Sequence, residues 1–375
     1  KHGSINLGQG FPDNELEGPA SLKEVAHRHM LSESNQYAPM MGTPALREAL
    51  GRHSARYAGL TLEDPLTQTL VGMGATEVLA AAFMGLLNPG DEVVLFAPLY
   101  DSYLPLIRLI GARPKIVNLS PPDWEVSKQE LERAITADTK LVVINTPHNP
   151  TGKVFTPETL ETLASLMKRH DVFGVLDEVY EHLVFPGHRH DSLRALPGMA
   201  ERCVRIGSAG KTFSYTGWKV GWLTGPSVLV AAAAKAHQFL TFSVSPALQA
   251  AVAHGLDEEK AFYEGLGGVL AAKRAKLQKR LEAIGFEVLP AQATYFLVAD
   301  FKPLLEPDSQ ETDTQFCERI TVEAGVTLIP VSAFYDDGPN REAAPKTLVR
   351  FVYCKTDERL TAACDKLQAY FAKEQ

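Results

Sequence analysis

Lys211 lies in a segment, residues 208–222, whose composition could support chemistry on a carbonyl group. An amine with a lowered pKa attacks carbonyl carbons and forms imines. Gly210 allows a ligand to approach the backbone closely, and the Ser208 hydroxyl and Lys219 ammonium could bind a phosphate. A lysine between small residues is more commonly a solvated side chain, so this segment alone leaves the role of Lys211 open.

Ser208 and Lys211 also form the spacing S-x-x-K, which is a signature of serine acyl-enzymes. The companion S-D-N and K-T-G sequences of that signature are absent from the chain. The acyl-enzyme hypothesis is therefore much the weaker one.

Asp177 ends an apolar run that starts at Val172, and Tyr180 follows three residues later. A carboxylate there could keep a ring nitrogen of a bound heterocycle protonated, while Tyr180 could donate a hydrogen bond to an oxygen on that ring. Asn149 lies in a proline-rich loop after another β-branched run and could bind the same oxygen. The simpler alternatives are an acid that caps a helix and a plain turn.

A strand that breaks at Gly72 and Gly74 leads directly into a helix with Ala75 and Thr76 at its start. Backbone N–H groups at a helix start suit a phosphate, although the stretch matches neither G-x-x-x-x-G-K-[ST] nor G-x-G-x-x-G. Tyr100 follows the next strand and could stack on a planar cofactor. A tyrosine packed at a helix start is the commoner situation.

Arg350 interrupts an otherwise apolar strand near the C-terminus. A buried arginine needs an anionic partner, and its fork of donors matches the carboxylate of an amino acid. A structural salt bridge explains the residue equally well at this stage.

These residues must be positioned by an alternation of short apolar runs and longer amphipathic stretches, which predicts a parallel sheet covered by helices. Ligands of such sheets bind beyond the carboxyl ends of the strands. The expected strands are 68–71, 92–96, 115–118, 140–145, 172–177, 203–207 and 220–224, and the expected helices are 76–87, 100–110, 127–135 and 157–170.

After about residue 245 the pattern changes, with helices expected at 261–284, 312–323 and 357–372 and strands at 295–299 and 347–353. The predicted fold class is α/β, with a large domain built on a mostly parallel sheet covered by helices and a smaller α+β domain. The expected division is an N-terminal segment, 1–35, that joins the small domain or forms an arm, a large ligand-binding domain, 36–255, and a small C-terminal domain, 256–375.

The composition excludes several classes of protein. A formal net charge of −8 without a long Lys/Arg run argues against nucleic-acid or anionic-membrane partners. The four cysteines form no C-x-x-C pair, so neither a disulfide framework nor a metal site is predicted, and a reducing, cytoplasmic location is the expectation. Apolar runs are too short to span a bilayer, and a natural N-terminal piece, with any targeting segment, could precede the chain.

In their order and spacing, these segments resemble the fold-type-I aminotransferases of class I/II, which depend on pyridoxal 5′-phosphate (PLP). Within that superfamily the chain is most similar to kynurenine aminotransferases (glutamine transaminase K) and methionine aminotransferases. The segments that carry the resemblance are residues 6–13, 145–150, 177–182, 208–213, 216–219 and 332–335. Residues 237–242 resemble the methionine enzymes more than the kynurenine enzymes.

The resemblance implies that Lys211 forms the Schiff base with PLP and moves the proton between the substrate Cα and the cofactor C4′, and that Asp177 pairs with the pyridine nitrogen. The resemblance also places Tyr180 and Asn149 at the ring oxygen and Tyr100 on the ring face. The implied phosphate contacts are Gly74, Ala75, Thr76, Ser208 and Lys219, together with Tyr37 at the phosphate of the neighbouring subunit of a homodimer. Arg350 is implied to bind the substrate α-carboxylate, helped by Asn149 and the backbone near Gly10.

The implied activity is ping-pong transfer of the amino group from an aromatic or sulfur-containing amino acid (kynurenine, methionine, glutamine or phenylalanine type) to a 2-oxo acid. Aspartate should be a poor donor because no second arginine for a side-chain carboxylate is evident. β-Elimination from cysteine S-conjugates needs the same Lys211 and Asp177, so the sequence leaves it open. A non-enzymatic PLP-binding regulator would usually carry a basic helix-turn-helix domain, and the sequence contains none.

Overall fold

The computed structural model describes residues 3–13 and 16–374. The β-branched and aliphatic runs in the first part of the chain form a seven-stranded sheet in the order β2-β8-β7-β6-β5-β3-β4. Its strands are β2 (Thr69–Gly72), β3 (Glu92–Ala97), β4 (Arg113–Asn118), β5 (Thr139–Asn145), β6 (Phe173–Asp177), β7 (Cys203–Ser208) and β8 (Gly221–Thr224). All seven expected strands are confirmed, with bounds shifted by one or two residues.

Strands β3 to β7 run parallel, whereas β8 pairs antiparallel with both β7 and β2. Two neighbouring parallel strands need a crossover connection, usually an α-helix, that carries the chain back to the end of the sheet where the first strand began. Between β7 and β8 the chain forms only α8 (Ala209–Thr212) and a 3₁₀ turn (Thr216–Trp218). It therefore turns back beside β7, which places both ends of the 208–222 segment at the same edge of the sheet.

Helices cover this sheet, and four of them, α4 to α7, follow the expected amphipathic stretches. Thr156 caps α7 through the backbone N–H of Thr159, and Pro157 occupies the first turn. Helix α4 packs against α5, α9, β7 and β8, and α6 packs against α7 and β4. The helices of this part are α1 (Ala20–Ser32), α2 (Pro44–Tyr57), α3 (Pro65–Gln68), α4 (Gly74–Leu86), α5 (Tyr103–Ile110), α6 (Lys128–Ala134), α7 (Pro157–Arg169), α9 (Ser227–Leu240) and α10 (Pro246–Glu258).

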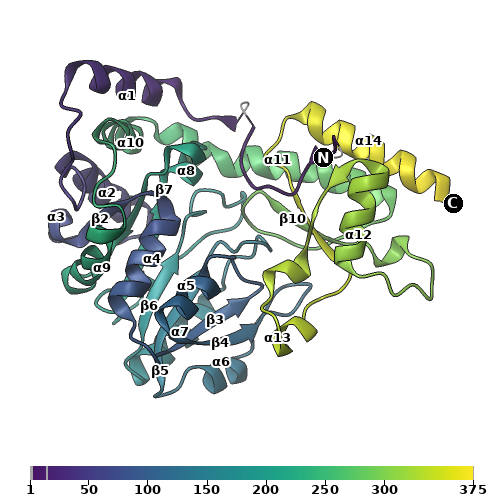
Figure 1. Cartoon of the computed structure of the whole chain (residues 1–375), viewed down its shortest axis with the longest axis horizontal. Helices are drawn as coiled ribbons and strands as arrows, with labels where there is room; N and C mark the ends of the chain where they lie inside the picture. Colours follow the sequence, from purple (N-terminus) through teal and green to yellow (C-terminus); the bar gives the residue numbers. More distant parts are fainter. Residues whose placement is uncertain (1–2, 14–15, 375) are drawn as a thin grey trace.

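The C-terminal part is built around an antiparallel sheet in the order β12-β13-β10-β9. Figure 1 shows this part, green to yellow, beside the seven-stranded sheet, with the long helix α11 extending from one to the other. Its elements are α11 (Lys260–Ile284), β9 (Glu287–Val288), β10 (Phe296–Asp300), α12 (Asp313–Arg319), β11 (Val326–Thr327), β12 (Ile329–Pro330), α13 (Pro339–Glu342), β13 (Leu348–Val352) and α14 (Asp357–Glu374). The helix expected at 312–323 is α-helical only to Arg319 and continues as a π-helical turn, Ile320–Ala324.

The N-terminal segment contacts both parts of the molecule. Strand β1 (Ile5–Asn6) pairs in parallel with β11, and the carbonyl of Leu7 accepts a hydrogen bond from the backbone N–H of Val352. Helix α1 instead packs against α10 (Figure 1). The segment therefore crosses between the two parts, whereas the expected domain boundaries at 35/36 and 255/256 stay predictions.

None of the described helices is long and apolar enough to cross a bilayer. The four cysteines are buried and carry free thiols. The cytoplasmic location stays a prediction.

Candidate active site

A cavity opens at the carboxyl ends of the central strands, where ligands of such sheets bind. Asn145 ends β5, Asp177 ends β6 and Ser208 ends β7, and the register of the sheet places Asn145 beside Asp177. The cavity is lined by Gly74, Ala75, Thr76, Leu79, Tyr100, Asn145, Asn149, Asp177, Val179, Tyr180, Ser208, Gly210, Lys211, Thr216 and Lys219. Lys211 and Asp177, which are far apart in the sequence, thus face the same space.

Asp177 is a buried carboxylate with one oxygen unsatisfied. Tyr103 donates a hydrogen bond of 2.5 Å to Oδ2, whereas Oδ1 is buried without a hydrogen-bond partner among the described residues. Burial raises the pKa of Asp177 to about 6, against the lowering effect of the Tyr103 hydroxyl. A buried, unpaired carboxylate oxygen is unfavourable by itself and requires a donor or cation from a ligand.

Lys211 lies on the short helix α8, directly after β7, and its side chain is partly buried. Burial lowers its pKa to about 8, because the ammonium form loses its hydration, and Asp177 opposes this shift. About a tenth of the amine is therefore neutral at pH 7, far more than for an ordinary lysine, and a nucleophile or proton acceptor requires this neutral form.

Groups suited to an anion gather in the cavity around the start of α4. Ala75 and Thr76 are in the first turn of this 13-residue helix, where backbone N–H groups have no intrahelical acceptor. Ser208 and Lys219 line the same cavity; Ser208 pairs with Gly221, which contacts the start of α4, and the Lys219 Nζ atom lies beside Gly74. Lys219 has a left-handed backbone, with φ of 54°. This combination of dipole, hydroxyl and ammonium suits a phosphate.

Glycines permit this close arrangement of strand and helix. A Cβ atom on Gly221 would lie 2.4 Å from the carbonyl carbon of Gly74 and 2.5 Å from the nitrogen of Ala75, so only glycine lets β8 contact the start of α4. Gly74 has a φ of +78°, and its own Cβ would lie 3.1 Å from the Lys219 Nζ atom. Substitution at either position would therefore disturb the anion-binding end.

Arg350 is buried on β13 at the edge of the site and has no carboxylate partner within the described residues. It donates to the Asn149 Oδ1 atom at 2.9 Å and to the Gly8 carbonyl at 2.8 Å, while its Nε atom has no partner there. The guanidinium carbon lies 4.4 Å from the Phe296 ring centroid and 4.7 Å from that of Phe334. Burial lowers the pKa of Arg350 to about 10, so the group stays charged at neutral pH. The structural salt bridge considered from the sequence is thus not what satisfies it.

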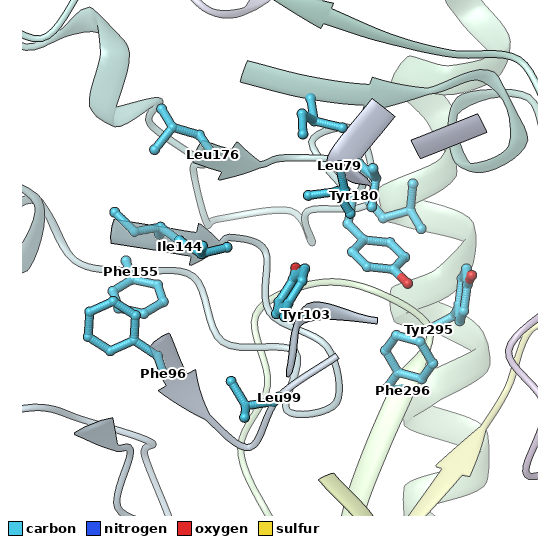
Figure 2. Packing of buried hydrophobic residues seen from close by; sticks show 14 of the residues in the cluster. Leu79, Phe96, Leu99, Tyr103, Ile144, Phe155, Leu176, Tyr180, Tyr295 and Phe296 are labelled. Atoms are coloured by element: carbon cyan, nitrogen blue, oxygen red, sulfur yellow. The ribbon is translucent and has the colours of Figure 1, made fainter. Parts of the chain in front are cut away.

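Two of the predicted aromatic residues are also at the cavity. Tyr180 and Tyr100 line it, and burial raises the pKa of Tyr180, which therefore remains a donor. Figure 2 shows Tyr180 grouped with the rings of Tyr295 and Phe296, near Tyr103. Ring centroids of Tyr100 and Tyr103 are 5.6 Å apart in an edge-on arrangement. The specific roles of Tyr100 and Tyr180 toward a cofactor stay predictions.

Besides Arg350, which lies behind Asn149, two of the predicted residues, Tyr37 and Gly10, do not line the cavity of the single chain. Tyr37 is 83% exposed, and its ring contacts that of Phe242 with centroids 5.5 Å apart. Gly10 lies beyond the cavity wall, where its carbonyl accepts a hydrogen bond from the Tyr295 hydroxyl at 2.9 Å. The role of Tyr37 stays a prediction, and Gly10 is coupled to the site through Tyr295.

Sequence reasoning missed Tyr103, Asn145 and Tyr295. Asn145 bonds through its side chain to the carbonyl of Asp177 and the N–H of Asn149, at 2.9 and 2.8 Å. It lies inside the proline-rich motif, so its position at a strand end could have identified it. No local signal distinguishes Tyr295, because its hydroxyl is hydrogen-bonded to residues that are distant in the sequence. It accepts a hydrogen bond from Lys211 at 2.8 Å.

A second polar cluster, outside the residues that line the cavity, contains His53, Glu181 and His182. The two imidazoles hydrogen-bond each other with Nε2 atoms 2.8 Å apart, and Arg205 pairs with Glu181 and Glu178. Burial lowers the pKa of His53 to about 3, so this ring stays neutral. The Arg205 ion pairs join β7 to the residues that follow β6, whereas His53 Nδ1 and Glu181 Oε1 are buried without a hydrogen-bond partner among the described residues.

The fold and the site define a class of protein: an α/β enzyme with a partly buried lysine and a buried carboxylate facing a cavity that has an anion-binding end. A family model, aminotransferase class I and II, matches residues 3–367. The chain belongs to this family.

Individual relatives agree with this assignment. A probable N-succinyldiaminopimelate aminotransferase of Mycobacterium tuberculosis is 41% identical over 97% of this chain and 92% of the relative. A kynurenine–oxoglutarate transaminase of Dictyostelium discoideum is 38% identical over 98% and 91% of the two chains. The solved structure of an Escherichia coli protein with methionine aminotransferase function superposes with a TM-score of 0.92 at 40% identity, covering 98% of this chain and 94% of that one.

Members of this family use PLP, so the chain is a PLP-dependent transaminase. The residues present fit that cofactor. The unpartnered Oδ1 atom of Asp177 suits a protonated ring nitrogen, the start of α4 with Ser208 and Lys219 suits the phosphate, and the Lys211 amine suits the aldehyde. When bound, PLP withdraws electrons from the Cα atom of an amino acid.

Proposed function

We propose that the chain transfers amino groups from aromatic or sulfur-containing amino acids to 2-oxo acids by a ping-pong mechanism, with Lys211 as the lysine that bonds the cofactor. The observation that carries the proposal is that the Lys211 amine and the unpaired Asp177 oxygen face one cavity. Borohydride reduction of the holoenzyme, followed by peptide mass analysis, should find the cofactor on Lys211. Label on another lysine would contradict the assignment.

Each proposed role uses a property of the protein itself. The neutral fraction of Lys211 can accept the Cα proton, since burial lowers its pKa to about 8. Asp177 keeps the ring nitrogen protonated, because its buried oxygen has no other donor within the described residues. Tyr180 and Asn149 hold the ring oxygen. Arg350 binds the α-carboxylate with its free N–H groups, so the substrate Cα is presented to Lys211.

The proposed substrate class follows from how the cations of the site are used. Among the described residues that line the cavity the cations are Lys211 and Lys219, and Arg350 adds a third behind Asn149. The proposal uses all three cations: Lys211 bonds the cofactor, Lys219 binds the phosphate and Arg350 binds the substrate α-carboxylate. A single chain therefore leaves no cation for a carboxylate on the substrate side chain. The aromatic rings of Phe296 and Phe334 beside Arg350 favour apolar side chains.

Two of the relatives fall within this class and one does not. One is a methionine aminotransferase and another a kynurenine–oxoglutarate transaminase, whereas a third is described as acting on N-succinyldiaminopimelate. Elimination from cysteine S-conjugates gains no support from these relatives, which are transaminases. A donor panel of methionine, kynurenine, phenylalanine, glutamine, tyrosine, aspartate and N-succinyldiaminopimelate tests the proposal. A kcat/KM highest for either of the last two would contradict it.

We also infer that the enzyme acts as a homodimer, with Tyr37 reaching the phosphate of the neighbouring subunit. Tyr37 and Phe239 are 83% and 85% exposed, and Leu240 and Phe242 add further exposed apolar surface. Apolar surface of this extent favours coverage by a partner. Sedimentation analysis should give twice the monomer mass, and Tyr37→Phe should weaken PLP retention. A monomer with full activity would contradict the inference.

A further inference from the structure

Tyr295 connects three distant parts of the chain at the reactive amine. Lys211, which follows β7, donates a hydrogen bond to the Tyr295 hydroxyl at 2.8 Å. The same hydroxyl donates to the carbonyl of Gly10 in the N-terminal segment at 2.9 Å. Tyr295 itself directly precedes β10 of the C-terminal sheet.

The direction of these hydrogen bonds is determined by the Tyr295 hydroxyl. A phenolic hydroxyl has one proton and accepting lone pairs. In the structure its proton is directed to the Gly10 carbonyl, and the oxygen accepts from Lys211. Burial raises the pKa of Tyr295 well above its ordinary value, so the proton stays on the oxygen over the range in which Lys211 titrates.

The contact with Gly10 is held by tight packing. A Cβ atom on Gly10 would lie 2.9 Å from the Phe296 Cε1 atom and 3.2 Å from the Tyr295 Cε2 atom. The Gly10 backbone therefore rests directly on these two rings, and its carbonyl has little freedom to leave the hydroxyl.

We propose that Tyr295 is a positioning residue for proton transfer: it accepts an N–H of the free Lys211 amine and so directs the nitrogen lone pair into the cavity. This inference rests on the proposed role of Lys211 as the base. When Lys211 takes the Cα proton, the C–H bond breaks, an N–H bond forms, and the electron pair stays on the substrate–cofactor side. The resulting ammonium then keeps Tyr295 as its acceptor.

Other groups also act on the Lys211 amine. Asp177 and Cys354 favour its charged form, while Lys219 and Arg350 disfavour it. None of these four is hydrogen-bonded to the amine in the described part of the chain, whereas Tyr295 is. Removing the Tyr295 hydroxyl therefore removes the acceptor that orients the amine and leaves the surrounding charges in place.

The test compares Tyr295→Phe with Tyr263→Phe as a matched control. Tyr263 is also a buried tyrosine whose hydroxyl donates to a backbone carbonyl, that of Leu256, at 3.0 Å. The first readout is the loss of deuterium from α-deuterated methionine into solvent, catalysed by the holoenzyme without a 2-oxo acid. We expect Tyr295→Phe to slow this exchange by about 10- to 100-fold, with half-saturation changed less than about threefold.

The second readout does not depend on activity. The pH dependence with which fluorodinitrobenzene labels Lys211 in the cofactor-free chain reports the pKa of its amine. Since the charged amine loses an acceptor, we expect this pKa to fall by about one unit in Tyr295→Phe and to stay unchanged in Tyr263→Phe. Unchanged exchange and titration in Tyr295→Phe, or equal losses in both variants, would overturn the proposal.

Borohydride labelling separates this outcome from failure of the Lys211 assignment. If the parent enzyme carries no label on Lys211, the proposed base is wrong. If Lys211 is labelled and Tyr295→Phe behaves like the parent, the base stands and only the role of Tyr295 is refuted.

Discussion

Asp177→Asn should make the cofactor-free protein more stable while it damages the enzyme. The folded-state pKa of Asp177 is about 6, against 3.8 for the free side chain, because the carboxylate is buried with an unsatisfied oxygen. A difference of about two units corresponds to about 3 kcal/mol of unfavourable free energy in the ionised state. Asparagine has the same shape and no charge, and its carbonyl can still accept the hydrogen bond from Tyr103.

The sign of the pH dependence follows from the direction of the shift. Because the folded state binds the proton more tightly, the parent gains stability as the pH falls from about 6 to 3.8, and the variant does not. The advantage of Asp177→Asn should therefore be close to 3 kcal/mol at pH 7.5 and should shrink progressively below pH 6. At the same time its kcat should fall by at least about 100-fold, since the ring nitrogen loses its anionic partner.

Urea unfolding of the cofactor-free proteins at pH 7.5 and pH 5, followed by circular dichroism, measures the effect. Asp138→Asn is the control, since Asp138 is exposed and its substitution should change stability by less than about 0.5 kcal/mol. A variant no more stable than the parent at pH 7.5, or an advantage that does not diminish at pH 5, would refute the reasoning.

Three other substitutions or conditions test the remaining parts of the site. Arg350→Lys should raise KM for amino donors by about 100-fold with a smaller change in kcat, because a compact ammonium replaces the two-pronged guanidinium that matches a carboxylate. A fall confined to kcat in steady-state assays would argue against this role. Capture of PLP by the cofactor-free chain should accelerate up to about pH 8 and then level off, as Lys211 becomes neutral, and a stopped-flow rate independent of pH would contradict this. Gly221→Ala should weaken PLP binding at least about tenfold, because its Cβ would lie 2.4 Å from the Gly74 carbonyl carbon; equilibrium titration with unchanged affinity would refute the close approach.

Local patterns were sufficient for much of the fold. The β-branched runs before Asn145, Asp177 and Ser208 predicted three neighbouring strands, and polar residues at their ends predicted the site. The antiparallel direction of β8 and the helices α1, α2, α9 and α10 were missed. Their packing faces depend on partners far away in the sequence, as with α1 against α10.

The sequence by itself determined the chemical groups of the site and the strand ends that carry them. Hydrophobic periodicity and turn residues specify strands and their ends through residues only a few positions apart. Only the tertiary structure decided that Tyr103 would bind Asp177 and leave its other oxygen free, and that Tyr295 would link Lys211 to Gly10. These contacts join residues 74 to 285 positions apart. They exist because the sheet edge, the C-terminal sheet and the N-terminal segment pack together around one cavity, and no local pattern records that packing.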